Sequence, residues 1–271
     1  MITFPNAKIN LGLYVERKRE DGYHDLSTVF YPIPLTDAVE VVEAKETTLF
    51  TYGNQVDCPP EKNLVMKAYR LMAEEFKLPS VAIHLYKHIP DGAGLGGGSS
   101  DATSVAKILN SMFALGLSEE EIAVRVKRLG ADCPFFAYNR PMAARGIGDL
   151  LEPVDVDLRG YTMIVVKPDV SVPTAAAYAG GIPRVPETDV EKLVAKPVGQ
   201  WKGLLVNDFE ESIFPKHPEL SAIKQSLYDA GAVYASMSGS GSAIFGLFED
   251  DNLSDIFAAK CAQPLLYKMK L

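Results

Sequence analysis

A glycine-rich segment in the first half of the chain has the composition of an anion-binding loop. Residues 90–101 read Pro-Asp-Gly-Ala-Gly-Leu-Gly-Gly-Gly-Ser-Ser-Asp, and an apolar pattern with helical spacing follows directly. Glycine lets the backbone adopt positive φ and approach a ligand closely, while the free N–H groups of a helix start favour an anion. So dense a run of glycines costs conformational entropy, which favours a phosphate cradle over mere flexibility or tight packing.

Three residues at the end of this segment leave alternatives open. Ser99 and Ser100 either cap the helix or contact a phosphate or its metal ion. Asp101 favours the helix itself but repels a bound phosphate. It therefore either faces away from the ligand or acts through a divalent cation.

Two better-known nucleotide loops fit the segment poorly. Gly92, Gly94 and Gly97 formally match G-x-G-x-x-G, which brings a dinucleotide-binding oxidoreductase into consideration. In that fold an acidic residue about 20 positions on closes a second parallel strand, whereas residues 119–121 open a helix here. No Gly-Lys-Ser/Thr ending of a Walker A loop is present. The remaining interpretation is a phosphate loop of another class.

Lys8, Asn10 and Asp132 have side chains suited to phosphoryl transfer. Lys8 and Asn10 alternate with apolar residues, so they project from one face of a predicted strand. Asp132 follows a predicted helix in a loop. From the residues alone, a solvated strand-edge lysine and a turn-capping aspartate explain Lys8 and Asp132 better than catalysis does.

Metal and hydrolase sites are not indicated. His84 and His88 have chelating spacing on a helix, but on the predicted strand they lie about 13 Å apart. Cys133 is typical of a small buried residue rather than a nucleophile, and no Gly-x-Ser-x-Gly elbow is present. The three cysteines are odd in number without a C-x-x-C pair, which favours a reducing compartment and a cytoplasmic location.

The elements that must position these residues are mixed along the chain. Strands are predicted near 9–15, 29–34, 38–43, 47–52, 81–85 and 161–166, and on both sides of 238–242. Helices are predicted over 64–76, from the glycine segment to about 113, from 118 to 130, and over 218–230. This order favours an α+β fold over a doubly wound sheet.

Composition limits the partners. With 271 residues, 47% hydrophobic and 23% charged, the chain is typical of a globular protein of one large or two modest domains. A formal net charge of −8 argues against nucleic acid or an anionic membrane as a partner held by a global basic surface. The start carries no export signal, and the uncharged stretch 230–248 is interrupted by glycines, so two strands around a glycine loop explain it better than a membrane span.

Three ordered segments resemble the motifs of the GHMP small-molecule kinases and span nearly the whole chain. They are Pro5-Asn-Ala-Lys-Ile-Asn10, Gly92-Ala-Gly-Leu-Gly-Gly-Gly-Ser-Ser100 and Ser238-Gly-Ser-Gly-Ser242. The resemblance implies a two-domain α+β GHMP kinase fold, with an S5-domain-2-like N-terminal domain over 1–155 and a ferredoxin-like C-terminal domain over 156–271. It also implies ATP and Mg²⁺ as cofactors, while the protein ligands of Mg²⁺ stay unassigned.

Three further segments narrow the resemblance within that family. Lys18-Arg-Glu-Asp-Gly-Tyr-His24, Gly130-Ala-Asp-Cys-Pro-Phe-Phe136 and Val172-Pro-Thr174 are similar to members that phosphorylate the 2-hydroxyl of a cytidine-diphosphate-linked methylerythritol for non-mevalonate isoprenoid synthesis. Cys133 stands where valine is usual. Homoserine, mevalonate and sugar kinases share the central loop but lack Asp-Gly-Tyr-His; they and a non-catalytic nucleotide-binding module are the alternatives. The expected partner is thus a small molecule, and protein partners are not indicated.

The resemblance also implies roles for single residues. Asp132 matches the catalytic aspartate, which orients the hydroxyl and accepts its proton, and Lys8 the catalytic lysine, which stabilises the transferred phosphoryl group and keeps Asp132 ionised. The implied ATP-binding residues are Asn63, Lys87, Pro90, Asp91, Gly92, Ala93, Gly94, Leu95, Gly96, Gly97, Gly98, Ser99 and Ser100. The implied substrate-binding residues are Asn10, Tyr23, His24, Phe30, Thr174 and Tyr178. Turn positions for Tyr23 and His24, and core positions for Phe30 and Tyr178, are the structural alternatives.

Overall fold

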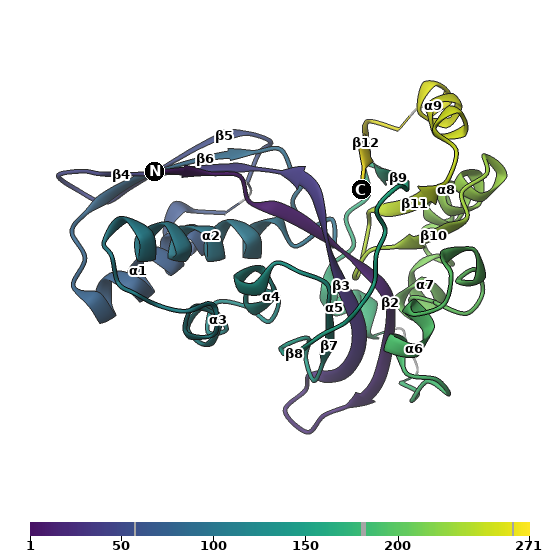
Figure 1. Ribbon diagram of the computed structural model, residues 1–271, viewed down its shortest axis with the longest axis horizontal. Coiled ribbons are helices and arrows are strands. Elements are labelled where there is room, and N and C mark those ends of the chain that lie inside the picture. The colour runs from purple at the N-terminus through teal and green to yellow at the C-terminus, as the bar shows by residue number, and fades with distance from the viewer. Residues whose placement is uncertain (57, 180–182, 262) are drawn as a thin grey trace. The chain divides into compact units, whose positions relative to one another are not determined.

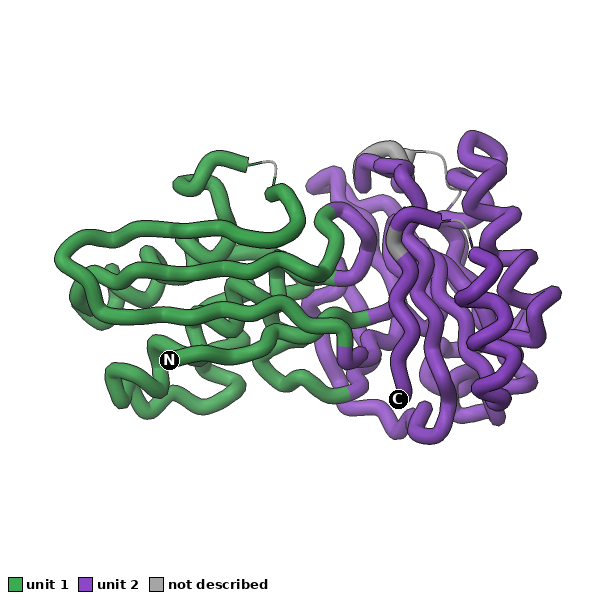
Figure 2. The backbone as a smooth tube through the Cα atoms, turned by 90° about the horizontal axis from the view of Figure 1, so that it is seen from above, with its two compact units in different colours: residues 1–8, 35–91, 96–140 green, residues 9–34, 92–95, 141–271 purple. Residues whose placement is uncertain are grey.

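The helices and strands of the protein group into two compact units (Figure 2). The computed structural model describes residues 1–56, 58–179, 183–261 and 263–271. Unit 1 consists of residues 1–8, 35–91 and 96–140, and unit 2 of residues 9–34, 92–95 and 141–271. Each unit is therefore assembled from separate stretches of chain. The predicted division into domains over 1–155 and 156–271 stays a prediction.

Unit 1 is a four-stranded sheet with helices packed on one face (Figure 1). The strand order is β1 (Ile2–Thr3), β4 (Ala38–Glu43), β6 (Val81–Lys87) and β5 (Thr48–Gly53). β5 and β6 are parallel, whereas the other pairs are antiparallel. The helices of this unit are η1 (Pro60–Lys62), α1 (Leu64–Phe76), α2 (Gly97–Met112), α3 (Glu119–Val126) and α4 (Cys133–Tyr138).

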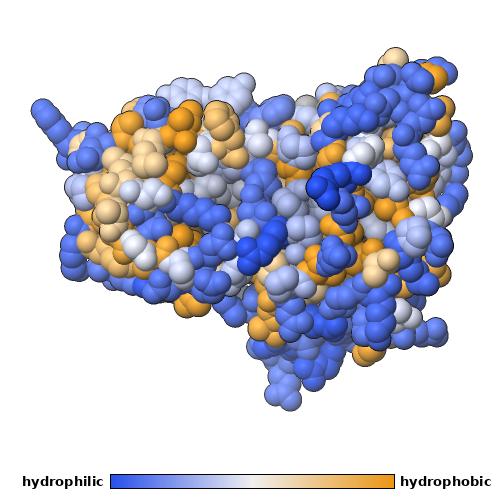
Figure 3. All heavy atoms as spheres, viewed as in Figure 1, coloured by the Kyte–Doolittle hydropathy of each residue, from blue (hydrophilic) through white to orange (hydrophobic). Residues whose placement is uncertain are grey.

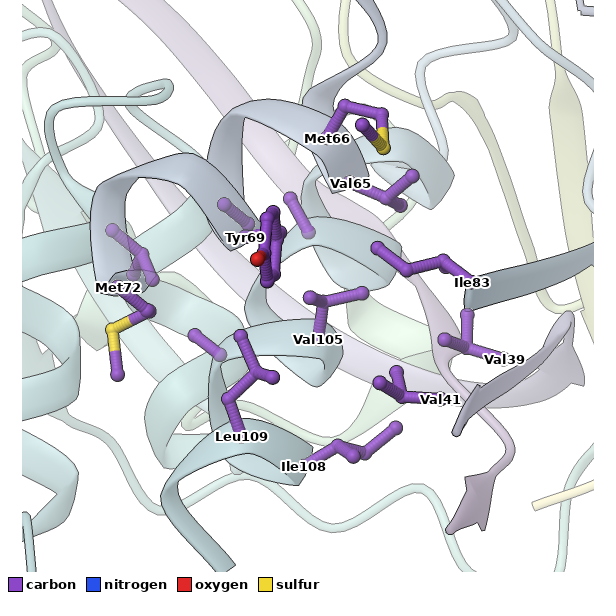
Figure 4. Close-up of a cluster of buried hydrophobic side chains, with 14 of the residues drawn as sticks. Val39, Val41, Val65, Met66, Tyr69, Met72, Ile83, Val105, Ile108 and Leu109 are labelled. Carbon is purple, nitrogen blue, oxygen red and sulfur yellow. The ribbon is translucent and has the colours of Figure 1, made fainter. Parts of the chain in front are cut away.

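The core of unit 1 joins its sheet to α1 and α2. Val41 and Ile83 project from the sheet toward Val65 of α1 and Val105 of α2 (Figure 4). All four side chains are buried. Burying each contributes about 1.5–3 kcal/mol, so α2 is held firmly against the sheet. Because α2 directly follows the glycine segment, this core also fixes the helix start on which the phosphate hypothesis depends.

Local sequence signals account for most helix boundaries in unit 1. α1 has the predicted bounds, and the Asn63 side chain caps it by accepting a hydrogen bond from the N–H of Val65 at 3.0 Å. The predicted capping box at the start of α3 is present. α3 ends at Val126 rather than near residue 130, because the N–H groups of Arg128 and Leu129 bond to carbonyls only three residues earlier, Leu129 to Val126 at 2.9 Å.

Unit 2 contains two further four-stranded sheets. In the first, the strand order is β2 (Asn6–Lys18), β3 (His24–Thr36), β7 (Met142–Arg145) and β8 (Leu150–Pro153), with the outer ends of β2 and β3 belonging to unit 1. Residues 7–15 of β2 are buried on both faces, so the polar face predicted for this strand is covered as well.

The second sheet of unit 2 has ferredoxin-like topology, as expected. Its strands lie in the order β10 (Tyr234–Met237), β11 (Ile244–Phe248), β9 (Thr162–Lys167) and β12 (Leu265–Lys270), and all pairs are antiparallel. With α8 (Pro218–Asp229) and α9 (Asp251–Lys260) the chain runs β-α-β-β-α-β. The shorter helices α5 (Thr174–Ala179), α6 (Val190–Val194), η2 (Val198–Gln200) and α7 (Phe209–Ile213) come between β9 and α8. The α+β prediction is confirmed.

The surface seen in Figure 3 is a mosaic of hydrophilic and hydrophobic residues. In the described part of the chain, no helix has both the length and the apolar character needed to span a bilayer. The predicted pair of strands around residues 238–242 is present as β10 and β11.

Candidate active site

Lys8 and Asp132 lie side by side within unit 1. The Lys8 Nζ atom is 3.5 Å from Oδ2 of Asp132, which is the residue immediately before α4. The Lys8 side chain is 4% exposed and that of Asp132 35% exposed. Burial lowers the pKa of Lys8, and the neighbouring Asp132 carboxylate offsets this only in part. The pair therefore presents an accessible carboxylate backed by a covered ammonium group.

Gly96 makes room for the Lys8 side chain. It adopts φ of +72°, and a Cβ atom at this position would lie 2.9 Å from Cζ of Phe136 and 3.1 Å from Cγ of Lys8. A larger residue must therefore displace the phenyl ring or the lysine stem. The close approach links the glycine segment physically to the Lys8–Asp132 pair.

The substitution Gly96→Ala is expected to reduce both stability and activity. The left-handed backbone costs about 1–2 kcal/mol of unfolding free energy in any non-glycine residue. Because the alanine side chain also displaces the lysine stem, kcat should fall by at least about tenfold. Gly116→Ala is the matched control, since Gly116 also has φ of +72° but nothing within 4 Å of its Cβ position. Denaturant unfolding should show the backbone cost in both variants and a further loss of stability in Gly96→Ala, and steady-state kinetics should show the kcat loss in Gly96→Ala alone.

The glycine segment leads into a helix whose start is open to an anion. Gly92, Gly94 and Gly96 all adopt positive φ, and Gly96 is the residue immediately before α2. Among the described residues, no side chain caps this helix. The N–H groups of its first turn are consequently available to a ligand, and the helix dipole favours a negative one. Ser99 and Ser100 lie inside the helix, so the capping alternative for them is wrong.

A pocket of about 170 Å³ opens beside this helix start, within unit 1. It is lined by Val56, Cys58, Lys62, Asn63, Leu64, Leu85, Lys87, Asp91, Gly98 and Asp101. Asn63, Lys87, Asp91 and Gly98 were each expected to bind ATP, and the structure brings these four together. Apolar side chains and the Asn63 amide line part of this pocket, and charged side chains line the rest.

The Lys87 amine is held between two buried carboxylates. Its Nζ atom contacts Asp37 and is 2.8 Å from Oδ2 of Asp101. Burial lowers the pKa of Lys87, but Asp101 and Asp37 outweigh this, so the net shift is upward. Asp101 thus pairs with Lys87 while it also lines the pocket, a position that differs from both alternatives noted for this residue.

In unit 2, the third glycine motif packs against the first half of the glycine segment. The Ser238 hydroxyl donates to the carbonyl of Gly94 at 2.9 Å and accepts the N–H of Asn10 at 3.3 Å. A Cβ atom at Gly94 would lie 2.0 Å from the carbonyl oxygen of Ser238, so only glycine fits there. Ser238 therefore connects Asn10, Gly94 and the β10–β11 loop, which are residues of all three motifs.

The expected substrate residues in unit 2 form two groups. The Asn10 side chain donates a hydrogen bond to the Thr28 hydroxyl at 3.0 Å, and the Asn10 backbone N–H donates to Ser238 of the third motif. The hydroxyl oxygens of Thr174 and Ser240, the latter also in the third motif, are 3.3 Å apart. The rings of His24 and Tyr178 stack with centroids 4.8 Å apart. None of these contacts was expected from the sequence.

Tyr23 and Phe30 lie in opposite environments. Tyr23 is 61% exposed in the turn before β3, where its N–H is bound by Asp21. Phe30 is buried in β3 opposite Met142. The turn and core alternatives noted for these two residues therefore describe their positions.

Sequence reasoning missed Asp37, Thr28 and the linking role of Ser238. Asp37 comes directly before a predicted strand, where an aspartate is typical of a turn. No short-range sequence pattern relates it to Lys87, which follows fifty positions later. The buried-cysteine prediction for Cys133 is confirmed, since the residue is fully buried and burial raises the pKa of its thiol to about 11. Among the described residues, no group of three or more His, Cys, Asp or Glu could hold a metal ion.

Two family models match the chain. The model of the GHMP kinases N terminal domain matches residues 63–140, and that of the GHMP kinases C terminal matches residues 190–264. Together these stretches cover more than half of the chain.

Relatives of known name match almost the full length. The chain is 52% identical over 255 residues to the 4-diphosphocytidyl-2-C-methyl-D-erythritol kinase of Bacteroides thetaiotaomicron, with 93% of each chain covered. It is 45% identical over 272 residues to the kinase of the same name from Cytophaga hutchinsonii, covering 98% of this chain and all of that one.

Solved structures agree with these matches. A crystal structure of 4-(cytidine 5'-diphospho)-2C-methyl-D-erythritol kinase superposes with a TM-score of 0.84 at 33% identity, covering 99% of this chain and 98% of that one. The mevalonate kinase of Methanococcus jannaschii superposes with a TM-score of 0.75 at 14% identity, covering 100% and 98%, and shows the shared fold alone. The chain belongs to the GHMP kinase family and, within it, to the 4-diphosphocytidyl-2-C-methyl-D-erythritol kinases.

Proposed function

We propose that the chain transfers the γ-phosphoryl group of ATP to the 2-hydroxyl of 4-diphosphocytidyl-2-C-methyl-D-erythritol, the substrate in the names of its relatives. The observation that carries the proposal is the 3.5 Å pair of Lys8 and Asp132, with its accessible carboxylate. A carboxylate within reach of a hydroxyl can orient it and accept its proton. Such a pair suits transfer to an alcohol better than simple nucleotide binding.

The reaction then proceeds with each group in a defined role. The hydroxyl oxygen attacks the γ-phosphorus while its proton passes to Asp132, and the bond from that phosphorus to the β-phosphate oxygen breaks to release ADP. Lys8 supplies positive charge for the oxygens of the transferred group. Its covered position strengthens this interaction, because fewer water molecules screen the charge there.

The nucleotide is proposed to bind along the glycine segment. The first-turn N–H groups of α2 at Gly97 and Gly98 face the phosphates, and the pocket lined by Asn63 and Lys87 receives the nucleoside. Mg²⁺ is proposed to arrive with the triphosphate, which together with water supplies most of its oxygen ligands. The half-buried Ser99 hydroxyl is an oxygen donor of the kind this ion prefers. When bound, the ion would neutralise part of the phosphate charge.

The acceptor is proposed to bind through residues of unit 2. Asn10 and Thr174 offer polar groups for the erythritol and diphosphate portions, and the stacked His24 and Tyr178 offer a ring face and an imidazole for the cytosine. Tyr23 and Phe30 complete the proposed set, with Phe30 acting from its buried position in β3. We propose the cytoplasm as the site of action and a small molecule, rather than nucleic acid or a membrane, as the partner.

The proposal is tested by incubating the purified chain with ATP, Mg²⁺ and the cytidine-diphosphate-linked methylerythritol. ADP and a singly phosphorylated acceptor should appear in equal amounts, as measured by coupled spectrophotometry and mass spectrometry. Homoserine and mevalonate, supplied separately, should give no turnover above background. Turnover of either in place of the proposed acceptor would reassign the substrate, and ATP binding without turnover of any acceptor would point to a nucleotide-binding module instead.

A further inference from the structure

Three charged side chains share one buried cluster beneath the proposed nucleotide pocket. Asp37 lies between β3 and β4, Lys87 ends β6, and Asp101 lies one turn into α2. Lys87 contacts both carboxylates, and the three side chains are at most 5% exposed. With all three ionised, the cluster carries one uncompensated negative charge, which is costly to bury. The proposed mechanism uses neither aspartate.

The two carboxylates are not equivalent. Oδ1 of Asp37 accepts the backbone N–H groups of His88 at 2.5 Å and Ile89 at 2.7 Å, and its Oδ2 contacts Lys87. These donors stabilise a negative charge on Asp37. Oδ2 of Asp101 accepts the 2.8 Å hydrogen bond from Lys87, and its Oδ1 atom has no hydrogen-bond partner among the described residues. Asp101 is therefore the carboxyl that more readily takes up a proton.

The environment of Asp101 supports this assignment. Burial is the largest cause that raises its pKa to about 7; Lys87 opposes the rise and Asp37 adds to it. The other ionisable groups that line the same pocket are Lys62, Asp91 and Cys58. Asp101 is thus the carboxyl of this cluster whose protonation changes near neutral pH.

The cluster also touches the part of α2 that is proposed to hold phosphate. Lys87 Nζ lies 3.1 Å from the position that a Cβ atom would take at Gly97, the first residue of α2. Asp101 and Gly98 line the same pocket. An ionised Asp101 repels phosphates bound at this turn, and bound phosphates in turn disfavour the ionised form. Phosphate binding and protonation of Asp101 therefore favour each other, as thermodynamic linkage requires.

We propose that nucleotide binding is coupled to proton uptake by Asp101, so that this carboxyl is neutral while phosphates occupy the start of α2. The proton comes from solvent and bonds to the Asp101 carboxyl. The cluster then holds one positive and one negative charge. The inference rests on the proposed function, since it requires that unit 1 bind a nucleotide, and it adds a proton to that binding reaction.

Isothermal titration calorimetry with ADP and Mg²⁺ tests the coupling. At pH 8 the terminal phosphate of ADP is fully ionised, because phosphate groups of this kind have a second pKa of about 6. Titrations in two buffers of different ionisation enthalpy give the number of protons bound. The wild type should take up a substantial fraction of a proton, whereas Asp101→Asn should take up close to none. The Kd of the wild type should also rise more steeply with pH than that of Asp101→Asn, by up to about tenfold per pH unit.

The controls distinguish a failure of the proton coupling from a failure of the proposed function. Glu43→Gln removes an equal charge from the exposed end of β4 in the same unit and should behave as the wild type. ADP binding without proton uptake by the wild type overturns the coupling and leaves the proposed function intact. Proton uptake that persists unchanged in a folded Asp101→Asn variant also overturns it. Absence of ADP binding by the wild type contradicts the proposed function itself. If the variant does not fold, the wild-type proton count alone decides.

Discussion

Replacing Asp132 with asparagine should lower kcat by about 10²–10⁴-fold while leaving the affinity for ATP nearly unchanged. The amide keeps the size of the side chain but cannot accept the proton of the attacking hydroxyl. The 3.5 Å contact with Lys8 loses its charge attraction, yet the nucleotide pocket of unit 1 does not include this residue. Steady-state kinetics gives the kcat loss, and equilibrium titration with ADP measures nucleotide affinity independently.

Asp155→Asn serves as the control for the Asp132 substitution. Asp155 is exposed, so the same chemical change there should leave both kcat and nucleotide affinity at wild-type values. If Asp132→Asn retained wild-type kcat, the residue would be a turn aspartate and the proposed proton acceptor would have to be another group.

Replacing Lys8 with methionine should lower kcat by about 10²–10³-fold, as expected for loss of a group that stabilises charge in the transition state. Methionine preserves most of the apolar stem that packs against Gly96, so the change removes the charge more than the packing. Lys67→Met, on the exposed face of α1, is the matched control and should retain wild-type activity. A rise in KM for ATP with kcat unchanged would contradict a role in the chemical step.

The pH profile provides a second test of Lys8. Burial lowers the pKa of this lysine, with Asp132 opposing, so the free enzyme loses the required proton below the ordinary value of 10.5. The value of kcat/KM for the acceptor, measured at saturating ATP, should therefore fall on the alkaline side before pH 10.5 is reached. The residual activity of Lys8→Met should lack this decline.

Elements with strong local signals were predicted well. The apolar spacing over residues 64–76 gives the observed bounds of α1, and the glycine-serine run 238–242 lies between two paired strands. The α+β class and the ferredoxin-like topology are also confirmed. The helix bounds, the paired strands and the α+β class depend on periodicity and turn chemistry within short stretches, which a single sequence records directly. The ferredoxin-like topology was implied by the resemblance to the GHMP kinases.

Features that depend on distant contacts were not predictable in the same way. Lys8 was interpreted from the residues alone as a solvated strand-edge lysine, but it is buried because β2 is covered on both faces. The orientation of Asp101 could not be decided from the sequence. Its contact with Lys87, and the contact of Lys87 with Asp37, form only when the sheet packs against α2. The short α4, which begins directly after Asp132, carries too few residues for a periodic signal.

The most direct test of the account is a structure of the protein with the cytidine-diphosphate-linked methylerythritol and a non-hydrolysable ATP analogue. The distance from the substrate 2-hydroxyl oxygen to the nearer carboxylate oxygen of Asp132 should be about 2.6–3.2 Å, with Lys8 Nζ directed at the γ-phosphate. A 2-hydroxyl that instead faced a different acid or base, with Asp132 out of hydrogen-bonding reach, would contradict the assignment of this residue as the proton acceptor.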